Sequence, residues 1–219
     1  MESIVKFSYP DVRCRCTLKR IVRRRFVSVE ELLAKAQFTQ STVGLPDGSN
    51  VEQLEVRNSK RFTTMVEFDM SSDLVNYDLR KLLSDDIPMW DNTLEYDIIE
   101  YSVGGFFKEH QDKKIKENHF ATLLIFPPAV GSLTHTGGEL IIDRGRFHFD
   151  SSSNREWTFI AFHTELPHEC KEVLSGRRVV FKTELYSEKP VLRRQDRYPE
   201  FGVMDRGIRH IPPTPDFTD

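Results

Sequence analysis

The stretch Tyr101–Asp112, YSVGGFFKEHQD, ends with a histidine and a carboxylate two residues apart. On a β-strand, side chains at positions i and i+2 point to the same side, so His110 and Asp112 can grip one ion together. An H-x-D pair occurs by chance in many chains, so a metal site needs a third ligand from elsewhere. His168 is the candidate, because it lies 58 residues after His110 and follows the apolar segment WTFIAF. Two imidazoles and one carboxylate on one face are typical of non-haem iron(II) sites with open coordination positions.

A candidate anchor for an anionic co-substrate lies ten residues after His168, on the segment RRVVFKTELY. Strand alternation places Arg177 with apolar residues, on a face suited to packing against helices. Arg178 falls on the opposite face, as expected of a residue that lines a polar cavity. We therefore predict that Arg178, and not Arg177, holds a carboxylate in a two-pronged hydrogen bond. The packed face carries Arg177, Val179, Phe181 and Leu185. The cavity face carries Arg178, Val180, Lys182 and Glu184.

The rest of the chain alternates short β-like segments with Gly, Pro and Asp turns. Such a pattern predicts a mainly β (α+β) fold of the jelly-roll or sandwich type. The predicted strands are Arg61–Phe68, Leu94–Tyr101, His119–Phe126, Gly138–Ile142, Trp157–His163 and Arg177–Tyr186.

Two helices are predicted before these strands. Ser28 and Glu31 have the spacing of a capping box, and Val29–Gln37 follows as a short helix. Ser71 or Ser72 caps a second helix that we expect to carry four residues toward the core. These are Leu74, Tyr77, Leu79 and Leu82. Residues 39–53, TQSTVGLPDGSNVEQ, are predicted to form a loop, which is either a lid over the site or an ordinary surface loop.

Composition restricts the class of protein. The chain has 219 residues, is 38% hydrophobic and has a formal net charge of -3, which gives no overall attraction to nucleic acid or anionic membranes. It has neither a membrane-spanning apolar stretch nor an apolar leader at its start, and its three cysteines have no disulfide spacing. We expect a cytoplasmic or nuclear protein. The basic residues between Arg13 and Arg25 are interpreted as a solvated face, with phosphate contact as the alternative.

We expect a single domain over residues 1–186 and no internal repeat. Its first part, about residues 1–90, supplies helical support, and residues 94–186 supply the β core. After Ser187 the chain is rich in proline and charge, so residues 187–219 are predicted to form an extended arm or tail.

Together the motifs resemble the prolyl 4-hydroxylase-like members of the 2-oxoglutarate/Fe(II)-dependent dioxygenase superfamily, over about residues 94–186. The resemblance implies a double-stranded β-helix (jelly-roll) core with N-terminal supporting helices. It implies Fe(II) bound by His110, Asp112 and His168, 2-oxoglutarate held at its distal carboxylate by Arg178, and Tyr101 as a further cofactor-binding residue. The motifs are Tyr101-x-x-Gly104-x-x-Phe107-x-x-His110-x-Asp112, the strand from Ala121, the turn Gly137-Gly138-Glu139, and His168 followed by Gly176 and Arg178.

The sequence departs from this family at three positions near the expected cofactor. Phe126 stands where several relatives carry a tyrosine, and Val180 and Lys182 stand where relatives often carry small hydroxyl residues. These differences concern the fine structure of the cofactor pocket and the substrate side.

The resemblance implies hydroxylation of a protein or peptide side chain, with proline as a candidate, and release of succinate and carbon dioxide. Ascorbate is a candidate auxiliary reductant. The alternatives are a nucleic-acid or small-molecule oxygenase of the same superfamily, and a jelly-roll binding module without catalysis. The oligomeric state is left open.

Five other histidines compete for the role of metal ligand. His163 ends an apolar strand and is expected to be a hydrogen-bonded core residue. His135 and His148 are expected in turns or at the surface, with a position facing the substrate as the alternative for His135. None of the competitors has the Gly176 and Arg178 continuation at the spacing seen after His168. The five are His119, His135, His148, His163 and His210.

Overall fold

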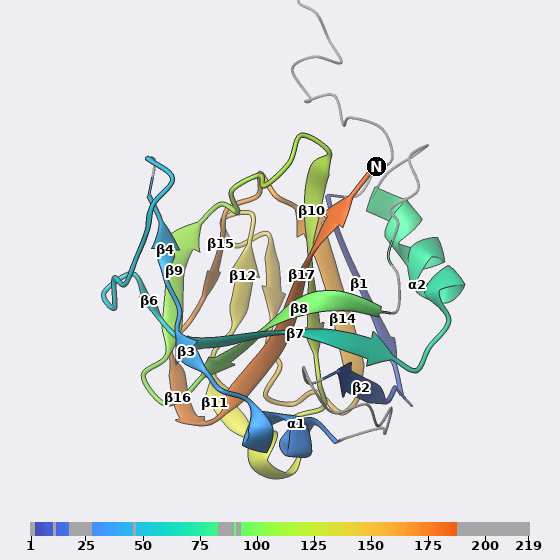
Figure 1. Ribbon diagram of the computed structural model, residues 1–219, viewed down its shortest axis with the longest axis horizontal. Helices are drawn as coiled ribbons and strands as arrows, with labels where there is room; N and C mark the ends of the chain where they lie inside the picture. The colour runs from blue at the N-terminus through green and yellow to red at the C-terminus, as the bar shows by residue number, and fades with distance from the viewer. Residues whose placement is uncertain are drawn as a thin grey trace, which may run out of the picture.

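A long strand that carries Arg178 lies within an eight-stranded antiparallel sheet (Figure 1). The computed structural model describes residues 3–10, 12–17, 28–45, 47–82, 90 and 93–187. The order of the sheet is β1 (Ile4–Tyr9), β14 (Trp157–His163), β10 (His119–Phe126), β17 (Arg178–Tyr186), β8 (Thr93–Tyr101), β7 (Lys60–Phe68) and β2 (Cys14–Thr17), with β3 (Thr39–Gln40) also paired with β7.

A smaller antiparallel sheet of five strands faces the larger one (Figure 1). Two two-stranded sheets accompany it, and the described helices and 3₁₀ turns are short. The five strands are β13 (Phe147–Phe149), β12 (Leu140–Ile142), β15 (His168–Cys170), β9 (Phe106–His110) and β6 (Arg57–Asn58). The two-stranded sheets are β11 (His135–Gly137) with β16 (Val173–Gly176), and β4 (Val43–Gly44) with β5 (Asn50–Val51). The helical elements are α1 (Val29–Lys35), α2 (Ser72–Leu79) and the 3₁₀ turns Arg80–Leu82 and Gly131–Leu133.

Two apolar layers hold these elements together. One lies between the two sheets and combines residues of β8, β10, β14 and β17 with residues of β12, β13 and β15. The other covers the outer face of the larger sheet, where α1 and α2 pack through residues such as Leu32 and Leu79. The predicted double-stranded β-helix with N-terminal supporting helices is therefore confirmed, and the predicted strands match the observed ones within two residues at each end.

The N-terminal part contributes more than helical support, because β1, β2, β3 and β7 all join the larger sheet. Five of the seven basic residues between Arg13 and Arg25 fall outside the described residues, as does the predicted tail after Ser187. The boundary between an oxygenase domain and a tail therefore stays a prediction. None of the described helices has the length and apolar character needed to span a membrane.

The second helix differs from its predicted orientation. Leu79 and Leu82 are buried as expected, but Leu74 and Tyr77 are 57% and 66% exposed. Val75 is buried instead, so the buried face follows positions 75, 79 and 82, which lie on one side of a helical turn. The prediction was wrong because it counted apolar residues without fixing the helical phase.

The predicted loop 39–53 also contains more structure than expected. Thr39–Gln40 pairs with β7, and Val43–Gly44 pairs with Asn50–Val51 as a small hairpin.

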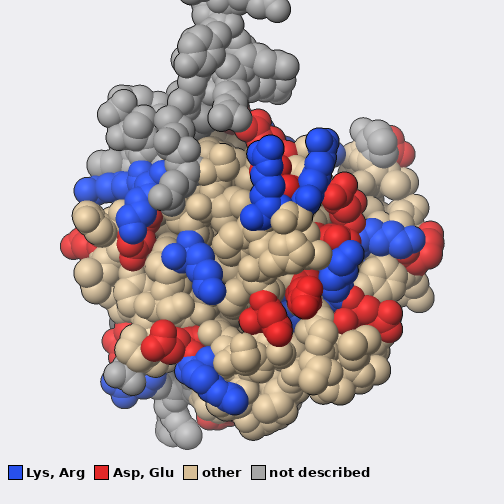
Figure 2. Space-filling model, turned by 180° about the vertical axis from the view of Figure 1, so that it is seen from behind, with Lys and Arg blue, Asp and Glu red and all other residues tan. Residues whose placement is uncertain are grey.

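Elsewhere on the surface, the face seen in Figure 2 carries interspersed basic and acidic side chains. This mixture agrees with the nearly balanced totals of 31 basic and 34 acidic residues.

Phe68 provides a test of the outer apolar layer. Its ring is fully buried and lies 5.3 to 6.3 Å from the ring centroids of Tyr96, Trp157, Phe159 and Phe181. We predict that Phe68→Ala lowers the free energy of unfolding by about 3–5 kcal/mol, because it leaves a cavity among packed rings. Urea denaturation measures this loss. Val103→Ala, at a residue 63% exposed, should change stability by less than about 0.5 kcal/mol. A loss for Phe68→Ala as small as that of the control would contradict the assignment.

Candidate active site

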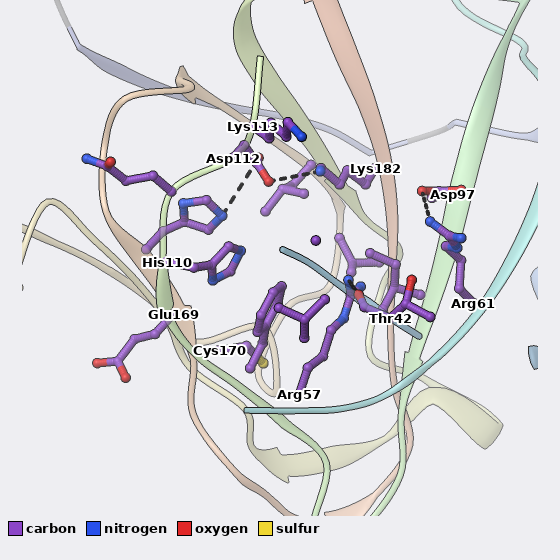
Figure 3. A pocket seen from close by; sticks show the side chains of 18 of the residues that line it. Thr42, Arg57, Arg61, Asp97, His110, Asp112, Lys113, Glu169, Cys170 and Lys182 are labelled. Carbon is purple, nitrogen blue, oxygen red and sulfur yellow. Dashed lines mark hydrogen bonds and ion pairs between the residues drawn. The ribbon is translucent and has the colours of Figure 1, made fainter. Parts of the chain in front are cut away.

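A cavity of about 480 Å³ lies at the open side of the β-helix (Figure 3). Its walls come from β8, β10 and β17 of the larger sheet, from β6, β9, β12 and β15 of the smaller sheet, and from the β4–β5 hairpin. All five site residues that the sequence singled out line it. These are Tyr101, His110, Asp112, His168 and Arg178.

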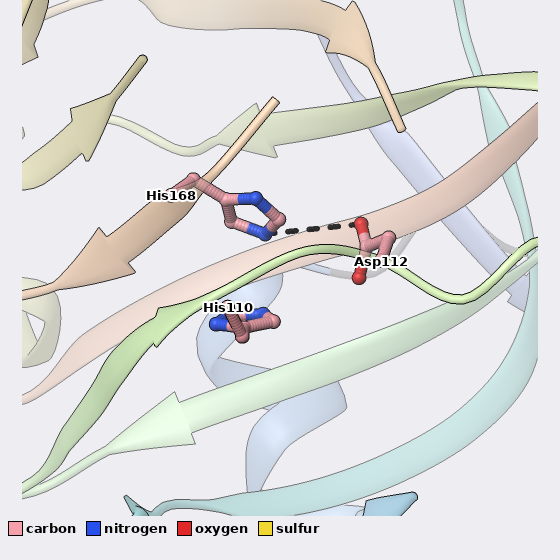
Figure 4. Close-up of side chains that lie close together, drawn as sticks. All are labelled: His110, Asp112 and His168. Atoms are coloured by element: carbon pink, nitrogen blue, oxygen red, sulfur yellow. Dashed lines mark ion pairs between the residues drawn. The ribbon is translucent and has the colours of Figure 1, made fainter. Parts of the chain in front are cut away.

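The three candidate metal ligands converge at one wall of this cavity (Figure 4). His110 is the last residue of β9 and is paired in register with His168, the first residue of β15. Asp112 follows two residues after the end of β9. One nitrogen or oxygen from each side chain lies within 4.8 Å of the others, and His168 Nε2 is 3.8 Å from Asp112 Oδ2. This spacing and this donor set fit a divalent iron ion.

Each imidazole is oriented by a backbone carbonyl. His110 Nδ1 lies 2.8 Å from the carbonyl oxygen of Lys108, and His168 Nδ1 lies 3.0 Å from that of Leu166. A carbonyl only accepts, so each Nδ1 must donate, and each Nε2 keeps a free lone pair. Burial lowers the pKa of His110 to about 3, with nearby His168 adding to the effect, and burial also lowers the pKa of His168. Both rings are therefore neutral at neutral pH, as metal binding requires.

Asp112 is held at both of its oxygens. The Thr122 hydroxyl donates to Oδ2 at 2.5 Å, and the Lys182 ammonium donates to Oδ1 at 3.0 Å. Burial raises the pKa of this carboxyl, but the positive charge of Lys182 together with these two hydrogen bonds outweighs burial and keeps the pKa below its usual value. Asp112 is therefore ionised and fixed in orientation.

Arg178 is a buried guanidinium that lacks a carboxylate partner among the described residues. The residue is only 2% exposed, and its Nε has no hydrogen-bond acceptor. Its guanidinium carbon lies 5.1 and 5.2 Å from the ring centroids of Tyr101 and Phe126. Gly138 makes room for it, because a Cβ at that position would lie 2.6 Å from Arg178 Cδ. A charge buried in this way requires an anionic ligand, and the carboxylate of a small dicarboxylic acid would satisfy it.

The neighbours of Arg178 follow the alternation predicted from the sequence. Val180, Lys182 and Glu184 line the cavity with Arg178, whereas Arg177 points elsewhere and forms an ion pair with Glu100.

Tyr101 lies directly opposite Arg178 on the adjacent strand β8. It is 4% exposed, and burial raises the pKa of its phenol to about 12. It is therefore neutral at physiological pH, and a neutral phenol can donate a hydrogen bond.

The competing histidines lie away from this cavity, as far as the chain is described. His119 is buried and His148 is exposed. The prediction for His135 was wrong, because it is a buried strand residue that hydrogen bonds to Ser151 and to the carbonyl oxygen of Leu133. His210 lies outside the described residues.

Sequence reasoning missed the groups that support the metal ligands. Lys182 was expected on the cavity face, but its ion pair with Asp112 depends on a contact between residues 70 apart. The Phe107 ring stacks on His110 with a centroid distance of 3.5 Å, and the guanidinium carbon of Arg57 lies 4.5 Å from the Phe107 ring centroid. Thr122 could have been noticed as a polar residue in an otherwise apolar strand.

No protein-family model matches the chain, and no curated protein matches it. Among solved structures, the chain is similar to a 2OG-Fe(II) oxygenase family oxidoreductase from Burkholderia pseudomallei, with 14% identity, a TM-score of 0.46, and coverage of 74% of this chain and 78% of that one. A Trichoplax adhaerens prolyl hydroxylase, solved with a peptide fragment of a hypoxia inducible factor, has 17% identity, a TM-score of 0.48, and coverage of 74% and 76%. A Pseudomonas putida prolyl-4-hydroxylase has 13% identity, a TM-score of 0.40, and coverage of 74% and 97%.

The lowered pKa values of His110 and His168 give a pH test of the metal site. We predict that the affinity for Mn(II) falls less between pH 7 and pH 5.5 than it would for two exposed histidines, because burial lowers the pKa of both rings. Two exposed histidines with a pKa near 6.5 would instead lose about tenfold in affinity each over this range. Electron paramagnetic resonance of free Mn(II) measures the affinity.

The lowered pKa values of His110 and His168 also determine how the stability of the metal-free protein changes with pH. Between pH 6.5 and the lowered pKa values, the unfolded chain binds more protons at these rings than the folded chain. Stability should therefore fall as pH drops below 6.5. A hundredfold loss of Mn(II) affinity at pH 5.5, in protein that circular dichroism shows to be folded, would contradict neutral buried ligands.

Proposed function

We propose that the protein is an Fe(II)- and 2-oxoglutarate-dependent dioxygenase that hydroxylates a protein or peptide side chain, with proline as the first candidate, and releases succinate and carbon dioxide. The observation that carries the proposal is the presence, in one cavity, of a two-histidine, one-carboxylate cluster and a buried arginine without a counter-ion. His110, Asp112 and His168 would hold the iron, and Arg178 would hold the distal carboxylate of 2-oxoglutarate. Iron and 2-oxoglutarate supply the oxidising chemistry that amino-acid side chains lack.

The protein itself contributes orientation and exclusion of water. Carbonyl groups fix both imidazoles, while Thr122 and Lys182 fix Asp112. The neutral phenol of Tyr101 can donate to the co-substrate beside Arg178. Apolar side chains that line the same cavity help to exclude water, which strengthens the electrostatic interactions inside it. They are Ile99, Leu124, Leu140 and Val180.

The outer wall of the cavity supports a peptide as substrate. It includes Thr42, Val43, Gly44 and Asn50, which lie in or beside the β4–β5 hairpin. Among the described strands, β4 and β5 pair only with each other, so their outer backbone groups can pair with an extended chain. The hairpin belongs to the segment that the sequence suggested as a lid.

The first experiment is an anaerobic titration of the metal-free protein with Fe(II) and 2-oxoglutarate. We expect the visible charge-transfer band of an iron-chelated keto acid, because the cluster leaves coordination positions open. His168→Ala should abolish the band, and His148→Ala, at an exposed histidine outside the cavity, should keep it. A folded wild-type protein that gives no band would contradict the proposal and favour the binding module.

Arg178 gives a second test, with the adjacent Arg177 as a matched control. We predict that Arg178→Gln weakens 2-oxoglutarate binding by about 30-fold or more, because loss of one partner of a buried charged pair costs about 2–5 kcal/mol. Arg177→Gln removes a charge outside the cavity and should change the affinity less than about threefold. Titration of the same absorption band measures both. Equal losses in the two variants would contradict the assignment of Arg178.

The substrate class can be searched with the same protein. Succinate formation is followed with proline-containing peptides, single-stranded DNA and RNA, and small acids, with ascorbate as the proposed auxiliary reductant. Succinate that rises only with peptides supports the proposal. Succinate that rises only with nucleic acid or small acids would replace the peptide hydroxylase with the corresponding oxygenase.

A further inference from the structure

The outer part of the cavity contains one arginine whose charge is not balanced by a neighbouring carboxylate. Arg61 is paired with Asp97 at 3.4 Å, and Lys182 is paired with Asp112 at 3.0 Å. Arg57 also lines the cavity. In the described part of the chain it has no carboxylate within 4.0 Å.

The protein acceptors of Arg57 are all neutral. Its Nε donates to Ser59 Oγ at 3.0 Å, and its Nη1 donates to the backbone carbonyl of Thr42 at 3.3 Å. A guanidinium has five N–H groups, so donors remain available for a ligand. Figure 3 shows Arg57 and Thr42 on the side of the cavity opposite Asp112 and Lys182, with the guanidinium directed inward.

Arg57 is also held rigidly with respect to the metal cluster. It lies on β6 directly opposite Phe107 of β9, and its guanidinium carbon lies 4.5 Å from the Phe107 ring centroid. The Phe107 ring in turn stacks on His110, with an angle of 21° between the planes. A donor fixed in this way loses little conformational entropy when it binds an anion.

Arg57 and Arg178 occupy different parts of the cavity. Arg178 is almost fully buried among aromatic rings, whereas Arg57 is partly exposed and bound to the segment that leads into the β4–β5 hairpin. One dicarboxylic co-substrate accounts for Arg178 and for the metal cluster. Arg57 is left for a second anion, which enters from the hairpin side.

We propose that Arg57 binds a carboxylate of the primary substrate, which is therefore an acidic peptide or a small carboxylic acid. This inference rests on the proposed function, because it takes the outer cavity to be the substrate side. A carboxylate suits the flat guanidinium, which can bind both of its oxygens. A side chain of Asp or Glu and a free acid offer the same group, and the experiment separates them.

The experiment uses the full chain loaded with Mn(II) and 2-oxoglutarate, which holds the site without turnover. Two matched pairs serve as probes: N-acetyl-Asp-Pro-amide against N-acetyl-Asn-Pro-amide, and N-acetylprolinate against N-acetylprolinamide. Broadening of the probe proton signals by Mn(II) reports binding close to the metal. We expect the acid of one pair to bind about tenfold or more tightly than its amide, as for a hydrogen bond to a charged group. The pair that responds identifies a peptide side chain or a free acid.

Three variants identify the residue responsible. Arg57→Gln should reduce the affinity for the acid to that for the amide, and Arg57→Lys should restore part of the preference. Arg61→Gln, which changes a cavity arginine already paired with Asp97, should leave the preference intact. Binding of 2-oxoglutarate, followed by the charge-transfer band with Fe(II), should change less than about threefold in Arg57→Gln.

Several outcomes would overturn the inference while the proposed function stands. These are equal binding of acid and amide by the wild type, no binding of any probe, or an acid preference that survives in Arg57→Gln. Loss of 2-oxoglutarate binding in Arg57→Gln would assign this residue to the co-substrate instead. A trinucleotide that binds in an Arg57-dependent way when neither acid does would replace the carboxylate with a phosphate. Failure of the proposed function itself would appear separately, as the absence of the charge-transfer band in the wild type.

Discussion

Burying a guanidinium without a counter-ion carries a large free-energy penalty, and the residues around Arg178 in the cavity reduce this penalty. The faces of the Tyr101 and Phe126 rings offset part of it, since a cation near an aromatic face is attracted to the ring quadrupole. Gly138 is required beside it, because any side chain there would collide with Arg178 Cδ. A phenylalanine at position 126 supplies a ring face but no hydroxyl, so more of the burden of binding an anion falls on the arginine itself.

Every second residue of β17 faces the cavity, and three of these residues are charged. Arg178 lies deepest, Val180 separates it from Lys182, and Glu184 lies 3.9 Å from Lys182 at the outer end. Lys182 therefore interacts with two carboxylates, of which Asp112 is the closer. Lys182 donates to Oδ1 of Asp112, while Oδ2 accepts from Thr122 and lies 3.8 Å from His168 Nε2. Lys182 and Thr122 together thus fix the orientation of the Asp112 carboxylate beside the cluster.

The parts of the fold that could be predicted from the sequence are those set by local periodicity. Alternation on Arg178–Tyr186 separated the cavity face from the packed face, because one strand determines both. The convergence of His110 and His168 could be expected from motifs, but their direct pairing depends on the register of two strands far apart in sequence. The helix with Leu74 and Tyr77 was misjudged because few residues define its phase. No pattern in the sequence pointed to Arg57, because its contact with Phe107 depends on the pairing of the two-residue strand β6 with β9.

Arg57, Phe107 and His110 form a stack that links the β4–β5 side of the cavity to the candidate metal ligands. Arg57 donates to the carbonyl of Thr42, so the segment before the β4–β5 hairpin is tied to a ring that rests on a candidate metal ligand. An anion bound at Arg57 would neutralise a charge that also disfavours protonation of His110. It would do so without contacting the cluster directly. The wall that carries Arg57 and the wall that carries the candidate metal ligands therefore share one aromatic ring, because Phe107 contacts both Arg57 and His110.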